Sequence, residues 1–191
     1  MKNDGRSRMK ELEDYTGEFS PQIRLEDFSK GVLVNLIKMY TKLYMALDGF
    51  WYLTVMERQG NEEALTCDIK TWEKQGSYEM SKIAKQLDIK GDDVIAFMKA
   101  LQFSPWSLQQ EYQMEIINSR KAILTITHCP TLNALEKEGE GRENEICNLV
   151  DPGLFKDFVS YFNPNIEVRC LKSPPRQSES DICCKWEFSL D

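Results

Sequence analysis

Six cysteines are the side chains of this 191-residue chain with the most distinctive chemistry. Thiolates are soft, charged ligands that suit zinc or iron, and several of them gathered without a cation would repel one another. Their spacing here is long and irregular, unlike that of paired CxxC motifs, and free cysteines are often simply buried. Metal binding and plain burial are therefore both open. Cys67 lies far upstream in a helical region and is expected to be a core residue; the other five lie in the last third of the chain: Cys129, Cys147, Cys170, Cys183 and Cys184.

Strand alternation predicts which of these thiols face inward, because successive side chains on a strand point to opposite faces. On the last predicted strand Cys184 shares a face with Trp186 and Phe188, which predicts an inward Cys184 and a more exposed Cys183. On the preceding strand Cys170 shares a face with Ile166 and Val168, so Cys170 is also expected to point inward.

His128 is the only histidine of the chain, so a Ser-His-Asp arrangement would have to use it, and no serine lies in a nucleophile-elbow motif. His128 and Cys129 reach one metal ion only if the chain turns at the proline that follows them. Glu143 and Asp151 stand four residues on either side of Cys147, on the same face of a continuous helix. One of these carboxylates is a candidate general base, and a solvated acidic face is the alternative. There is no glycine-rich phosphate loop.

The elements that must position these residues follow from hydrophobic periodicity. A spacing of three and four predicts a helix from Leu33, with a break or bend at Asp48-Gly49, that ends at Gly60. Further helices are predicted over about 62–86 and from Asp92 to just before Pro105. A period of two predicts a strand after that proline. The remaining predicted elements are a strand over 123–127, helices over 131–138 and 143–162 (the second bent near 152–153), and strands over 165–171 and 181–190.

This order predicts an α+β fold in which N-terminal helices precede an antiparallel sheet of about four strands, in ββααββ order, with helices packed on one face. The chain divides into a polar N-terminal tail over 1–27, a helical part over 28–104 and a cysteine-containing α+β part over 105–191. Its length suits one globular unit that contains all three.

Composition narrows the classes of partner. The formal net charge is −7 and there is no Lys/Arg cluster after the first ten residues, so we expect no nucleic-acid binding. No apolar run is long enough for a membrane helix, so we expect no membrane partner. The start lacks the apolar core of a secretion signal, which predicts a cytoplasmic protein with reduced cysteines. A small-molecule ligand and a protein partner both remain.

Three features together resemble a known group of domains: a His-Cys-Pro stretch at 128–130 that opens a helix, Cys147 on the next helix, and a last strand that reads Cys-Lys-Trp-Glu-Phe from Cys184. They are similar to the small-molecule-binding domains of the four-vinyl-reductase type and the related aminothiazoline-carboxylate hydrolase-like proteins, over about residues 105–191. The resemblance implies an α+β ligand pocket with a cysteine-bound metal, often zinc. The matching positions are Cys129, Cys147 and Cys184. A long 172–180 loop replaces the usual short hairpin, which puts the role of Cys170 in doubt.

Three functional hypotheses follow. The first is a zinc-binding small-molecule-binding protein or metal-dependent hydrolase-like enzyme, in which three thiolates leave a fourth position open and aromatic side chains, Trp51, Trp72 and Trp186, line the ligand pocket. The second is a non-catalytic protein-interaction module whose structural metal site is closed by Cys170 or His128 as the fourth ligand. The third is an iron–sulfur protein.

Overall fold

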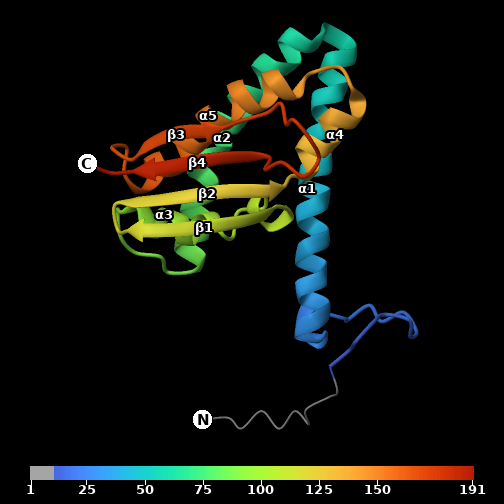
Figure 1. Cartoon of the computed structure of the whole chain (residues 1–191). Coiled ribbons are helices and arrows are strands. Elements are labelled where there is room, and N and C mark those ends of the chain that lie inside the picture. The colour runs from blue at the N-terminus through green and yellow to red at the C-terminus, as the bar shows by residue number, and fades with distance from the viewer. Residues whose placement is uncertain (1–10) are drawn as a thin grey trace.

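A computed structural model of the chain describes residues 11–191. It confirms the α+β fold, with long N-terminal helices followed by a four-stranded antiparallel sheet interleaved with helices (Figure 1). The elements in chain order are α1 (Lys30–Gln59), α2 (Asn61–Gln86), α3 (Val94–Leu101), β1 (Glu111–Asn118), β2 (Lys121–His128), α4 (Pro130–Glu138), α5 (Glu143–Phe162), β3 (Glu167–Lys172) and β4 (Cys184–Ser189), with short 3₁₀ helices at Leu25–Asp27 and Ser107–Gln109.

The sheet has the strand order β1-β2-β4-β3, and every neighbouring pair is antiparallel. Its two faces differ in chemistry. Leu124 of β2 lies opposite Trp186 of β4 on the inner face, and both are buried. On the outer face Glu187 accepts ion pairs at 2.8 Å from Lys121 on one side and from Arg169 on the other. The apolar face is therefore the one that the helices cover, as alternation along the strands requires.

Phe155 of helix α5 packs against three aromatic rings of the core. The ring of this residue meets those of Trp106 at 5.5 Å, Trp186 at 4.8 Å and Phe188 at 5.5 Å between centroids. Tilted and edge-to-face contacts at these separations add to the stabilisation from apolar burial. They fix α5 against the sheet, and α5 is the helix that presents Cys147 and Asp151.

Helix α2 packs on α5 at unusually close range. Gly76 of α2 is buried, and a Cβ atom placed on it would come 2.7 Å from the Cβ of Asp157 on α5. Beside it, the hydroxyl of Ser77 donates to the backbone carbonyl of Asp157 at 3.2 Å. The absence of a side chain at Gly76 lets the two helix backbones approach.

Two predicted boundaries are wrong. Helix α1 is continuous for 30 residues and runs through Asp48-Gly49 without a break, because one internal glycine lowers helix stability by only about 1 kcal/mol. Strand β4 begins at Cys184 and not at Asp181. Of the predicted polar tail, residues 1–10 lie outside the described part. From Leu12 the backbone pairs with Asp27 and Ser29 at the start of α1. Neither α1 nor any other helix within residues 11–191 is long and apolar enough to cross a membrane.

Candidate functional site

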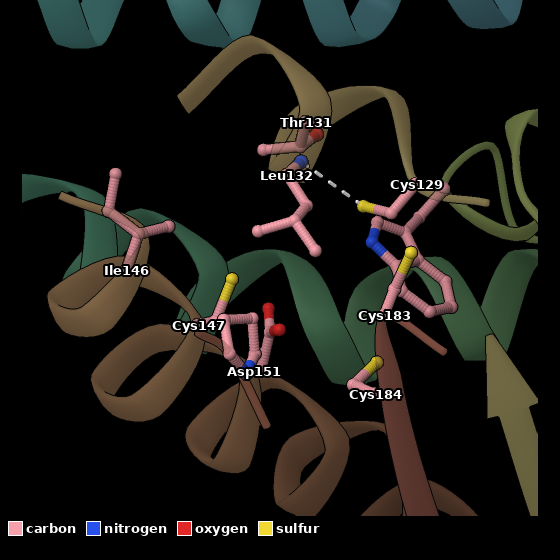
Figure 2. Close-up of a pocket in the computed structure, with 10 residues that line it drawn as sticks. Cys129, Thr131, Leu132, Ile146, Cys147, Asp151, Cys183 and Cys184 are labelled. Carbon is pink, nitrogen blue, oxygen red and sulfur yellow. Dashed lines mark hydrogen bonds between the residues drawn. The ribbon is translucent and has the colours of Figure 1, made fainter. Parts of the chain in front are cut away.

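A small cavity lies where the start of α4, the first half of α5 and the start of β4 come together. Its volume is about 30 Å³, enough for roughly one or two water-sized groups. Four cysteines and one carboxyl group face it (Figure 2). The side chains that line the cavity are Trp106, Cys129, Thr131, Leu132, Ile146, Cys147, Asp151, Pro174, Cys183 and Cys184.

Cys129 is held by the geometry of a helix start. It is the N-cap residue of α4, and its Sγ accepts a hydrogen bond from the backbone N–H of Leu132 at 3.4 Å. Pro130 occupies the first position of the helix, where its missing N–H costs nothing. The proline therefore ends β2 and turns the Cys129 side chain toward the cavity.

Cys147 and Asp151 are four residues apart on α5, so they share one face of the helix, as the sequence predicts. In Figure 2 the carboxyl group of Asp151 points into the space between the sulfurs of Cys147 and Cys184. Within residues 11–191 the Asp151 carboxyl group has neither a hydrogen bond nor an ion pair. Burial, followed by the negative charge of Asp68, raises the pKa of Asp151 to about 7. This carboxyl group therefore changes charge near neutral pH.

Cys184 and Cys183 both reach the cavity. Cys184 faces inward with Trp186 and Phe188, which confirms the predicted inner face of β4. The predicted exposure of Cys183 is wrong, because its side chain is only 1% exposed. Cys183 lies one residue before β4, although its backbone N–H donates to the carbonyl of Ile126 at 2.8 Å. Its side chain is covered by the preceding loop, from which the guanidinium of Arg176 donates to Sγ at 3.7 Å.

Burial keeps the cavity thiols protonated. It raises the pKa of Cys129 to about 12, and it also raises the pKa values of Cys147, Cys184 and Cys183. The Asp151 carboxylate raises the pKa values of Cys147 and Cys184 further. A thiol becomes a nucleophile or a metal ligand only as its thiolate. Without a bound cation these groups are therefore poor nucleophiles at neutral pH.

A metal ion would have to draw the cavity side chains inward. Among the residues that the structure describes, no group of three or more His, Cys, Asp or Glu side chains is arranged so that it could hold one ion. The sulfurs surround the cavity, and the Sγ of Cys129 is held by its N-cap hydrogen bond. Cysteine has a single side-chain torsion with three staggered positions, so rotation about Cα–Cβ is the motion available.

The remaining predicted ligands lie away from this cavity. Cys170 lies opposite Trp186 on the inner face of the sheet, as predicted, but its side chain is exposed. It lies on β3, the edge strand of the sheet, next to a register shift. His128 is also exposed, and its Nδ1 lies 3.3 Å from the side-chain amide of Asn133. Cys67 was expected in the core, but it is half-buried and its Sγ donates to Glu63 of the same helix.

The three tryptophans predicted to line a ligand pocket do not line this cavity. Trp51 is 41% exposed on α1. Trp72 packs edge-on against Tyr44 between α1 and α2, at 6.2 Å between centroids. Trp186 is buried in the aromatic core. The aromatic residue of the cavity is Trp106, which follows the Pro105 signal and carried no distinguishing pattern in the sequence.

Two carboxyl groups on other helices, the half-buried Asp48 of α1 and the buried Asp68 of α2, are coupled electrostatically to the cavity. Asp68 of α2 is 4% exposed, and its Oδ1 has no hydrogen-bond partner among the described residues. Burial and the charge of Asp48 raise the pKa of Asp68 to about 7, and burial raises that of Asp48 to about 6. The charge of Asp68 in turn raises the pKa of Asp151. Protonation of these three groups is therefore linked across α1, α2 and α5.

Comparisons with known proteins identify a family but no function. A search of curated proteins and a search of solved structures found no match to this chain. The model of a family of unknown function, DUF6125, matches residues 26–190, which include every helix and strand from α1 to β4. The chain therefore belongs to the DUF6125 family.

Proposed function

We propose that this protein binds a soft metal ion, zinc in the first instance, in the cavity between α4, α5 and β4. Cys129, Cys147 and Cys184 supply the thiolates. The observation that carries the proposal is that cysteines from three separate elements meet at one cavity whose lining contains no basic side chain. Plain burial of four cysteines would not require them to share a cavity with a carboxyl group that has no protein partner among the described residues.

The chemistry of the donors suits such an ion. Sulfur ligands favour zinc over magnesium or calcium, and a cavity of about 30 Å³ has room for an ion and one small ligand such as water. The raised thiol pKa values are those of the metal-free cavity. A divalent cation stabilises thiolates, so uptake should release protons and weaken as the pH falls.

Asp151 and Cys183 are the groups that decide whether the site is open. If Cys183 supplies a fourth thiolate the site is closed and structural, whereas three thiolates leave a position for water or a substrate atom. When bound, zinc in an open site supplies Lewis-acid chemistry. Asp151, with a pKa of about 7 and a carboxyl group directed at the cavity, can hold or release a proton there. This favours the small-molecule-binding or hydrolase-like alternative over a closed interaction module.

The other expectations from the sequence stay predictions. These are the resemblance to four-vinyl-reductase-type and aminothiazoline-carboxylate hydrolase-like domains, a small-molecule ligand, a protein partner and the iron–sulfur alternative. The DUF6125 family match covers the region of the resemblance and carries no function of its own.

Serine substitution at the three proposed ligands is expected to abolish stoichiometric zinc binding. Protein purified without oxygen should contain about one zinc per chain by mass spectrometry, whereas Cys129→Ser, Cys147→Ser and Cys184→Ser should each lower the zinc affinity by at least about 100-fold, because a neutral hydroxyl replaces a charged soft ligand. Cobalt(II) provides an independent readout, since thiolate coordination gives it intense near-ultraviolet absorption.

Cys170→Ser and Cys67→Ser are matched controls, because both thiols lie off the cavity. They should retain zinc and the cobalt spectrum. Zinc-free wild-type protein that takes up neither metal would contradict the proposal. A brown protein that contains iron would replace the zinc proposal with an iron–sulfur cluster. Cys183→Ser separates the closed from the open site, since only the closed site loses zinc.

A further inference from the structure

Helix α1 is apolar on the side that faces away from the rest of the molecule. Its inward side carries the buried Thr41 and Tyr52, which lie toward α2 and the 3₁₀ turn at Ser107–Gln109. The first half of α1 extends beyond the sheet and the other helices (Figure 1). Over the whole length of α1, nine large apolar side chains are 36–69% exposed: Val34, Ile37, Met39, Tyr40, Leu43, Leu47, Phe50, Trp51 and Leu53.

The outward face has the spacing of a coiled coil. Residues that repeat at alternating intervals of three and four form a straight seam, into which a second helix of the same period can interdigitate. The residues of α1 with this spacing, which we call the α1 seam, are Leu33, Leu36, Tyr40, Leu43, Leu47 and Phe50. The first two side chains of the seam are half-buried, and the last four are 56–69% exposed.

We propose that the α1 seam pairs with the α1 seam of a second copy of this chain. The heptad spacing calls for a long partner helix of the same period, and an identical copy supplies one by two-fold symmetry. Eight of these exposed side chains, all except Val34, lie in the seam or directly beside it. At on the order of 100 Å² each, they approach the ~800 Å² per partner of a standard interface.

Sedimentation equilibrium of the full chain over a range of concentrations tests this pairing. Wild-type protein should sediment with twice the mass of one chain. Leu43→Glu combined with Leu47→Glu should weaken dimerisation by about 100-fold or more, because it places charges at the centre of the buried seam. Both side chains are exposed in the single chain, so the circular dichroism and the melting of the monomer should stay unchanged. Lys38→Glu is the matched control, since Lys38 is exposed on the same helix but off the seam.

Three outcomes would overturn the proposal. The first is a wild-type chain that stays monomeric throughout the concentration range. The second is a dimer that survives the double glutamate substitution with unchanged affinity. The third is a monomer that co-sediments through α1 with vesicles of phosphatidylcholine and phosphatidylglycerol, which would assign the apolar face to a lipid surface.

Discussion

Replacing Gly76 with alanine is expected to lower the free energy of unfolding by about 2 kcal/mol, although alanine is the better helix former. The added Cβ would lie 2.7 Å from the Cβ of Asp157 and 3.4 Å from its backbone carbonyl carbon. These atoms belong to the body of α5 and not to the far end of a flexible side chain. The two helices must therefore move apart, and urea denaturation of both proteins measures the cost.

Gly49→Ala is the control for this prediction. Gly49 is also inside a helix, and nothing lies within 4 Å of the place that an added Cβ atom would occupy. This substitution should raise the free energy of unfolding by about 1 kcal/mol. Equal effects at the two glycines would show that helix propensity alone decides them and that α2 and α5 are not in close contact. Because α5 carries Cys147 and Asp151, a shift of this helix should also weaken zinc binding in Gly76→Ala.

Neutralising Asp68 is expected to stabilise the protein at pH 8 by about 2–4 kcal/mol, with little effect at pH 4. The folded-state pKa of Asp68 is raised from its ordinary value to about 7, chiefly by burial. The folded protein therefore holds this proton more tightly than the unfolded chain. The resulting stabilisation is fully present below about pH 4 and is lost as the pH rises through about 7.

Urea denaturation of Asp68→Asn and wild type between pH 4 and pH 8 measures this linkage. The stability of wild-type protein should fall toward pH 8, and the variant should show a shallower fall. Asp92→Asn is the control, because that side chain is exposed and its replacement should leave the pH profile unchanged. An Asp68→Asn profile parallel to that of wild type would mean that a cation or another group neutralises Asp68 in the folded protein.

Asp48 and Asp151 should contribute to the same pH dependence, since their pKa values are raised to about 6 and about 7. Their coupling also bears on the proposed site. A metal ion beside Asp151 would favour its charged form and thereby oppose the loss of stability above neutral pH. Zinc should therefore flatten the wild-type profile.

Local patterns were enough to predict the fold class and the inner face of β4. Cys184, Trp186 and Phe188 alternate with polar residues, and a strand with this period has one face to bury. Likewise, a shared helical face predicted that Cys147 and Asp151 would point the same way. Such inferences succeed because the geometry of a helix or strand is set within a few residues.

The composition of the cavity was decided by tertiary structure. Cys183 is buried because the Arg176 loop covers it, and Cys170 is exposed because β3 became an edge strand. Neither fact is a property of local periodicity. The burial of Asp68 likewise depends on helices that are far apart in the sequence. The heptad spacing of α1 can be read from the sequence. Which side of α1 stays exposed depends on where α2 packs, since burial is a property of the assembled molecule.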